Sequence, residues 1–449
     1  MSSTFFLKGK SRQVYKRKGE NIKKKVKKAN VPNLENGHES SDSDLEIKKF
    51  SDAEQSESDH ETAEQKKLRL AKKYLEEIER EEAKRAEFKD VEDAVEKRLQ
   101  RDYLEQKGKL RVEVANKYNV PTKENVRLIR VKEHRLTLTS VAVSNDNEYV
   151  FSGCKSGTFI KWSLKEKRRL GTVTYKTHSK YIKGGITSLA LTTDCKYLAM
   201  ADESNDIHIW DPHTLSHLHT FKGHKGPVIG LVFRKNTHDL YSASKDRSVK
   251  IWSLDEMAYV ETLFGHQSPI TAIDALTRER AITAGGRDTT VRIWKIVEES
   301  QLIFNGPQGS LDEVKLLDEE HFISGSDNGT ISLWSVLKKK PLFSVTEAHG
   351  VDNAVPRWIT SLATLLNSDL FASGSYDNNI RLWKIYDSYK KFEQMFSIEV
   401  NGFINCIQFT SDGQQLFAAV GQEHKSGRWF KDSNAKNGLI VANFNLSNK

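Results

Sequence analysis

The stretch SASKDRSVKIW, Ser242–Trp252, holds a serine, an aspartate and a tryptophan within eleven residues. A Gly-His pair, Gly223 and His224, stands a short way upstream. Serine, histidine and aspartate are together the residue types of a hydrolytic triad. They could equally mark a structural unit that repeats along the chain, and the positions of similar stretches separate the two interpretations.

Tryptophans recur at a nearly constant interval from about residue 125 onward. The gaps between successive members are 48, 42, 42, 40, 49 and 46 residues. These are Trp162, Trp210, Trp252, Trp294, Trp334, Trp383 and Trp429. A period near 40–45 residues, with Gly-His ahead of a strand-borne Trp, is typical of WD-type propeller blades of four strands each. The sequence therefore predicts an all-β fold, a seven-bladed WD-repeat β-propeller.

The Ser, His and Asp of the opening stretch belong to this repeat. Two full sets of four residues are His224, Ser242, Asp246, Trp252 and His349, Ser373, Asp377, Trp383. A third has His266, Asp288 and Trp294, with Thr283 displaced by one residue. Other blades depart from the pattern, at Ser156, Ser204, Pro307 and Asn328. Because buried polar groups must be paired and this set can pair within itself, we interpret it as scaffolding and predict no catalytic residue.

Two terminal segments look able to close the ring. NVRLIRVKEH (125–134) and GLIVANFNL (438–446) both have the character of an outer strand of the last blade. The sequence leaves open whether one or both contribute.

The chain before the propeller divides into three parts. Residues 1–31 carry 11 Lys or Arg and one Glu, which by itself exceeds the overall net charge of +9, and residues 35–61 are acidic and serine-rich. We predict a disordered arm over 1–60, amphipathic helices over 61–120 and the propeller over 121–449. The cluster KKKVKK predicts a nuclear-localisation signal made of Lys23, Lys24, Lys25, Lys27 and Lys28.

Cations recur in the turns between the second and third strands, which all point to one end of the ring. They are Lys155, Lys245, Arg247, Arg287, His424 and Lys425. Such a cluster suits contact with phosphate groups, and Arg can add bidentate recognition. The alternative is that they are ordinary exposed turn residues, some of them paired with nearby acids. Spacing alone does not decide between the two.

Several other classes of function find no support in the residues. Cys154, Cys195 and Cys406 lack the spacing of a zinc site or a disulfide framework, and the histidines show no paired metal spacing. No Gly-rich phosphate loop and no apolar run long enough to cross a bilayer is present. We expect a soluble intracellular protein with no cofactor, no metal and no enzymatic activity.

Several stretches together resemble one family. ETAEQKKLRLAKKYLEEIE (61–79), YVETLFGHQ (259–267), TAGGRDTTVRIWKIVEESQL (283–302), WITSLATLLNSDLFASGS (358–375) and VGQEHKSGRWF (420–430) are similar to the WD-repeat protein of the U3 small nucleolar ribonucleoprotein. The resemblance covers roughly residues 61–430.

That resemblance implies a non-enzymatic nucleolar protein of early ribosomal RNA processing for the small subunit. In the family the propeller binds the box B/C element of U3 small nucleolar RNA with the small protein that recognises its kink-turn, within the small-subunit processome. Carried onto this chain, TAGGRD and VGQEHKSGRW make Arg287, His424, Lys425 and Arg428 the candidates for contact with RNA or protein partners.

Two alternatives remain at this stage. One is a WD-repeat scaffold of another ribonucleoprotein, such as the spliceosomal U4/U6 particle, which copurifying U4 RNA would reveal. The other is a protein-only adaptor, for instance a substrate receptor of a ubiquitin ligase, which would recover ligase subunits and no RNA. The basic arm is unusual for a dedicated receptor.

Overall fold

The computed structural model describes residues 63–85, 95–96, 98–100, 103–104 and 111–446, except 308, 387, 428 and 429. The predictions for residues 1–60, including the basic cluster at 23–28, lie outside this range. Helix α1 (Ala63–Arg85) occupies part of the segment for which helices are predicted. No helix in the described ranges is long and apolar enough to cross a membrane.

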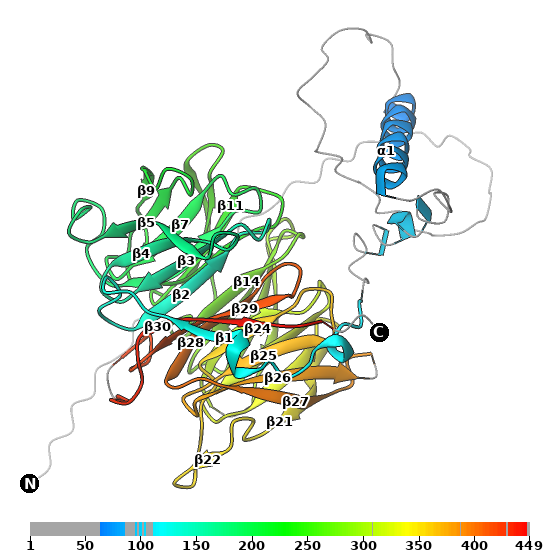
Figure 1. Ribbon diagram of the computed structural model, residues 1–449. Coiled ribbons are helices and arrows are strands. Elements are labelled where there is room, and N and C mark those ends of the chain that lie inside the picture. The colour runs from blue at the N-terminus through cyan, green and yellow to red at the C-terminus, as the bar shows by residue number, and fades with distance from the viewer. Residues whose placement is uncertain are drawn as a thin grey trace, which may run out of the picture. The chain divides into compact units, whose positions relative to one another are not determined.

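Seven antiparallel sheets of four strands each form most of the described residues from 126 onward (Figure 1). Blade one contains β2 (Leu138–Val143), β3 (Tyr149–Cys154), β4 (Thr158–Ser163) and β5 (Arg168–Thr174). Blade two contains β6 (Ile186–Leu191), β7 (Leu198–Asp202), β8 (Ile207–Trp210) and β9 (His217–Phe221). Blade three contains β10 (Val228–Phe233), β11 (Asp239–Ser244), β12 (Ser248–Ser253) and β13 (Ala258–Phe264). Blade four contains β14 (Ala272–Ala275), β15 (Arg280–Gly285), β16 (Thr290–Lys295) and β17 (Ser300–Asn305).

Blade five contains β18 (Leu311–Leu316), β19 (His321–Ser326), β20 (Ile331–Ser335) and β21 (Lys338–Val345). Blade six contains β24 (Ser361–Thr364), β25 (Leu370–Gly374), β26 (Asn379–Tyr386) and β27 (Lys391–Glu399). A small hairpin, β22 (Val351–Asp352) and β23 (Val355–Pro356), lies between these two blades in the chain. Blade seven contains β28 (Phe403–Phe409), β29 (Gln415–Gly421), β30 (Gly438–Asn443) and β1 (Val126–Ile129).

The ring closes through both terminal segments. The first strands of consecutive blades contact one another in a complete cycle, with β28 touching β2. In blade seven, β30 is the third strand and β1 pairs with it antiparallel as the outer strand. Of the two segments predicted as candidates for the outer strand, 125–134 supplies it, whereas 438–446 supplies the third strand instead. Both take part in closing the ring, and the seven-bladed propeller is confirmed.

The sequence interpretation of blade seven needs one correction. Trp429 was expected on the third strand of this blade because it fits the period of the other tryptophans. The third strand is β30, whose sequence GLIVAN contains no tryptophan. A long connection, residues 422–437, separates it from β29, so Trp429 falls in that connection and outside the described residues.

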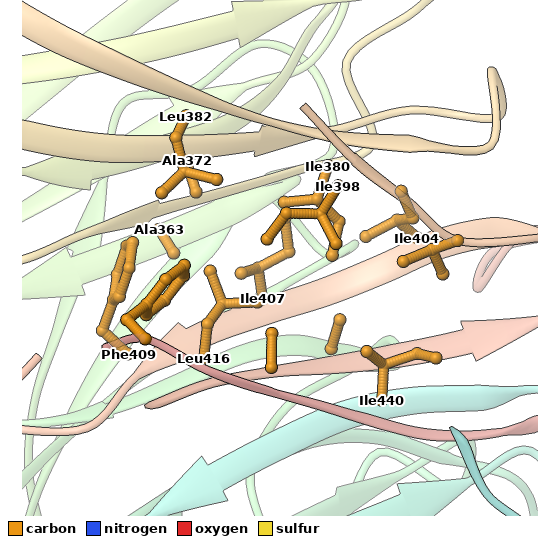
Figure 2. Close-up of a cluster of buried hydrophobic side chains, with 14 of the residues drawn as sticks. Ala363, Ala372, Ile380, Leu382, Ile398, Ile404, Ile407, Phe409, Leu416 and Ile440 are labelled. Carbon is orange, nitrogen blue, oxygen red and sulfur yellow. The ribbon is translucent and has the colours of Figure 1, made fainter. Parts of the chain in front are cut away.

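Apolar side chains from facing sheets fill the spaces between blades. Figure 2 shows the cluster shared by blades six and seven, in which Ile380, Ile404, Leu416 and Ile440 are buried. A fully buried side chain of this size contributes about 1.5–3 kcal/mol relative to an exposed one. Gly374 allows the close approach, because a Cβ there would lie 2.5 Å from Cγ2 of Ile404.

The segment just before β1 packs on the propeller as irregular chain. The backbone N–H groups of Val114 and Ala115 donate to Oδ1 of Asp369 at 2.8 and 3.0 Å, and the Tyr118 hydroxyl donates to the Gly413 carbonyl at 2.7 Å. Only two short 3-10 turns occur here, η1 (Ala115–Lys117) and η2 (Lys123–Asn125). Contacts with the propeller thus begin ahead of residue 121, the boundary that the sequence suggested.

Candidate nucleic-acid interface

The four residues of blade three form one hydrogen-bonded chain beneath the turn between β11 and β12. His224 places Nδ1 2.9 Å from Oδ2 of Asp246 and Nε2 2.8 Å from Oγ of Ser242. Trp252 donates its indole N–H to the same Oγ at 2.8 Å. A neutral His224 with its proton on Nδ1 satisfies every group in this chain. Ser242 and Trp252 are buried within the sheet, as a scaffold requires.

Blades four and six repeat this arrangement. In blade four, Oγ1 of Thr283 lies 2.7 Å from Nε2 of His266 and accepts the Trp294 indole N–H at 2.8 Å, so the displaced Thr takes the place of Ser. In blade six, His349, Ser373, Asp377 and Trp383 make the same three contacts at 2.9, 2.7 and 2.8 Å. A constellation that recurs in this way positions the chain rather than reacting with a substrate.

One further set was not identified from the sequence. His134 places Nε2 2.9 Å from Oγ of Ser152, which accepts the Trp162 indole N–H at 2.9 Å. A signal for it exists, because His134 precedes Trp162 by 28 residues, as His224 precedes Trp252. Blade one therefore has three of the four partners.

The carboxylate of each set also fixes the turn that carries the candidate cations. Burial opposes ionisation of Asp246, but hydrogen bonds from Ser248, His224 and two backbone N–H groups lower its pKa to about 2. Its Oδ2 accepts the backbone N–H of Lys225 at 2.8 Å and its Oδ1 that of Ser248 at 2.9 Å. The turn is thereby held at both sides of Arg247, whose φ of 70° lies in the left-handed region.

Three of the predicted cations are exposed in neighbouring blades. Lys245 and Arg247 lie in the turn of blade three, and Arg287 in the turn of blade four, next to an Asp288 whose pKa is also lowered to about 2 despite burial, by His266 and Thr290. Among the described residues no carboxylate forms an ion pair with any of the three cations. We call Lys245, Arg247 and Arg287 the cationic turns. Lys155, in the turn of blade one, is half-buried.

His424 and Lys425 do not belong to an exposed cation cluster, contrary to expectation. Burial lowers the pKa of His424 to about 3, and its Nδ1 accepts the Ser426 backbone N–H at 3.2 Å, so the ring is neutral near pH 7. Lys425 turns inward and bonds through Nζ to Oε2 of Glu313 at 3.1 Å. Arg428 lies outside the described residues.

Further cations near the cationic turns were missed from the sequence. The loops that enter blades two and three lie at the same end of the ring as these turns. They carry the exposed Lys176, Lys180, Lys183, Lys222 and Lys225. The positive charge of Lys183 is partly neutralised by Asp206, whose Oδ2 lies 3.4 Å from the Lys183 Nζ. The KGHK sequence around His224 could have revealed two of them, because it flanks the residue that binds Asp246.

A recess of about 260 Å³ lies at the same end of the ring between blades six and seven. Tyr376 and Phe403 stack in its wall with centroids 5.8 Å apart, and the Arg357 guanidinium lies 5.8 Å from the Tyr376 ring centroid. Asp352, Asp377 and Asp432 also line it. Because these acids outnumber the basic side chains Arg357 and Lys431, the recess adds no net positive charge to this end.

Comparison with known proteins agrees with this architecture. The WD domain, G-beta repeat family model matches residues 126–163, 171–211, 215–253, 257–295 and 342–384. U3 small nucleolar RNA-interacting protein 2 of Mus musculus is 50% identical over 391 residues, covering 85% of this chain and 82% of the mouse protein. This chain belongs to the U3 small nucleolar RNA-interacting protein 2 family.

Other members and a solved structure fit the same assignment. The Homo sapiens member of the U3 small nucleolar RNA-interacting protein 2 family is 48% identical over 395 residues, covering 85% of this chain and 82% of the human protein. The crystal structure of RRP9 WD40 repeats is 44% identical, with a TM-score of 0.71, and covers 73% of this chain and 100% of that one. The family model does not match blade five, where Asn328 and Pro307 replace the usual Asp and His.

Proposed function

We propose that this chain is a non-enzymatic component of the U3 small nucleolar ribonucleoprotein and binds U3 small nucleolar RNA through the cationic turns. It binds the box B/C region together with the small kink-turn RNA-binding protein of the particle. Other small-subunit processome proteins are further partners, and the protein acts in the nucleolus in pre-ribosomal RNA processing for the small subunit. Membership in a family named for interaction with this RNA supports the proposal.

One observation carries the RNA-binding part. The cationic turns present three exposed cations from two adjoining blades, with no carboxylate paired to them among the described residues. The Asp–His networks hold these turns in place before any ligand arrives. Fixed, unpaired cations suit phosphate oxygens, because little ordering of the protein is then needed on binding.

The test is a salt titration of U3 RNA binding by the full chain. Each phosphate contact contributes about 0.7–0.9 to the slope of log affinity against log salt. We expect Arg247→Glu with Arg287→Glu to weaken binding and to reduce the slope by roughly 1.5–2. The matched control is Lys338→Glu with Lys340→Glu, the same type of charge reversal at exposed positions of β21.

An unchanged affinity and slope in the arginine variant would remove the cationic turns from the RNA interface. The identity of the particle is tested separately, by sequencing the RNA that copurifies with the chain. Recovery of U4 in place of U3, or of ubiquitin-ligase subunits without RNA, would overturn the assignment.

A further inference from the structure

An aromatic side chain stands exposed beside the cationic turns. Phe264, the last residue of β13, is 74% exposed. The residue before it, Leu263, packs against the core between blades three and four, so alternation along the strand directs Phe264 the other way. The equivalent positions are Lys222, which directly follows β9, and Asn305, the last residue of β17, and both are exposed. An apolar residue is therefore not required there by packing.

Phe264 lies between the two arginine-bearing turns. On one side it is the strand partner of Ser248, the residue that directly follows Arg247. On the other side its chain continues through Gly265 to His266, whose Nδ1 lies 2.8 Å from Oδ2 of Asp288, the residue next to Arg287. The sequence order and the strand register thus place Phe264 between Ser248 and Asp288, the residues that adjoin Arg247 and Arg287.

The backbone under this ring is held firmly. A Cβ at Gly265 would meet Nη1 of Arg292 at 2.4 Å and Cη2 of Trp294 at 3.0 Å, so the chain lies directly against blade four here. The Gln267 backbone N–H also donates to Oδ2 of Asp288 at 3.1 Å. An exposed ring on a fixed support loses little conformational freedom when a flat ligand stacks on it.

We propose that Phe264 is a stacking platform for one unpaired nucleobase of the bound RNA, with Arg247 and Arg287 contacting the phosphates on either side. This proposal rests on the proposed RNA-binding function and names Phe264 as the residue that recognises an unpaired base. Proteins recognise RNA largely through unpaired loops and bulges whose bases stack on aromatic side chains. Positive charge alone would not distinguish such a base from a duplex, whereas an aromatic face does.

The experiment compares four variants of the full chain on two RNAs: the Arg247→Glu, Arg287→Glu variant and three single substitutions. The RNAs are a U3 fragment carrying 2-aminopurine at its unpaired positions and the same fragment with those positions base-paired. We expect Phe264→Leu to bind the unpaired RNA roughly ten-fold more weakly, with an unchanged salt slope because no charge is lost. Phe264→Tyr keeps the ring and should bind like the natural chain. Leu337→Ala, at an 82% exposed position in the turn between β20 and β21, is the matched control.

The outcomes separate this inference from the proposed function. Stacking is supported if Phe264→Leu weakens binding only to the unpaired RNA and abolishes quenching of one 2-aminopurine. It is overturned if Phe264→Leu binds normally while the arginine variant does not, which leaves the proposed function standing. It is also overturned if Phe264→Leu weakens only the binding of a protein partner. If neither variant affects RNA binding, the proposed function fails as well.

Discussion

Nζ of Lys425 lies 3.1 Å from Oε2 of Glu313, which joins the long connection of blade seven to the first strand of blade five. Both residues line the central channel of about 540 Å³, which the first strands of the blades surround. Burial disfavours the charge on Lys425, but Glu313 and neighbouring groups more than offset this and raise its pKa. The pair therefore ties the connection that follows β29 to blade five, across the central channel.

Breaking this pair should destabilise the propeller. Glu313→Gln removes the carboxylate that pairs with Lys425 and leaves the ammonium group in the channel. In a fully buried ion pair, the loss of one partner costs several kcal/mol. Because the side chains retain 21% and 12% exposure, we expect a loss of about 1–3 kcal/mol in the free energy of unfolding. Urea denaturation measures it. Glu256→Gln, at an exposed turn, should change stability by less than about 0.5 kcal/mol. Equal stability of both variants would show that the pair does not hold the connection.

Asp288→Ala tests whether the His–Asp networks hold the cationic turns. The substitution leaves Nδ1 of His266 and the backbone N–H groups of Gln267 and Thr290 without their acceptor. We expect a loss of about 2–4 kcal/mol in unfolding free energy, because a buried donor left unsatisfied costs about 1–3 kcal/mol and the buried His266 ring loses its carboxylate. Thermal and urea unfolding measure the loss. Asp255→Asn breaks a contact with a His at the surface and should cost about 1 kcal/mol or less. A comparable loss in both variants would contradict the structural role.

Much of the fold could be predicted because each blade repeats one local pattern. The spacing of Trp252, Trp294 and Trp383 places the third strands of three blades correctly, since the Trp covers its own blade's network. Trp429 gave a wrong position for the third strand of blade seven, because a long connection precedes that strand. The spacing of the tryptophans in the other blades does not predict the length of such a connection. The third strand of blade seven, β30, contains no tryptophan that could mark its position in the sequence.

The site was predictable only in part. The turns that carry Arg247 and Arg287 follow from the repeat, which sets their place at one end of the ring. The neutrality of His424 and the inward direction of Lys425 depend on burial by other blades, which are distant in sequence. Phe264 lies within the family-like stretch 259–267, yet its exposure follows only from the position of β13 at the outer edge of blade three.

The buried His134 should make stability depend on pH. Burial lowers its pKa to about 4, whereas a histidine in the unfolded chain has a pKa near 6.5. Between these values the unfolded chain binds the proton more strongly, so the stabilisation present above pH 6.5 is lost as the pH falls towards 4. The contribution amounts to about 2 kcal/mol between pH 8 and pH 5.

Urea unfolding at several pH values checks this. In the His134→Gln variant, stability at pH 8 should fall because Ser152 loses a partner, but the further loss on acidification should shrink by about 2 kcal/mol. The natural chain, measured at the same pH values, is the control. An unaltered pH dependence in His134→Gln would mean that burial does not lower the pKa of His134 in the folded protein.

A chain that begins at residue 121 should be less stable than one that begins at residue 109. The shorter chain lacks the N–H groups of Val114 and Ala115, which are the donors to the fully buried Asp369 carboxylate. It also lacks Tyr118, whose hydroxyl bonds to Gly413 and whose ring packs edge-on against Phe444 with centroids 5.0 Å apart.

We expect the truncation to lower the free energy of unfolding by about 3 kcal/mol or more, from an unpaired buried carboxylate and a lost aromatic contact. In the longer chain, Asp369→Asn should account for part of this loss. In the shorter chain, the same substitution should stabilise, because it removes a charge that has no donors left. Comparing the four proteins by urea denaturation decides the point. Additive effects of truncation and Asp369→Asn would show that residues 111–118 do not serve this carboxylate, because coupled partners must be non-additive.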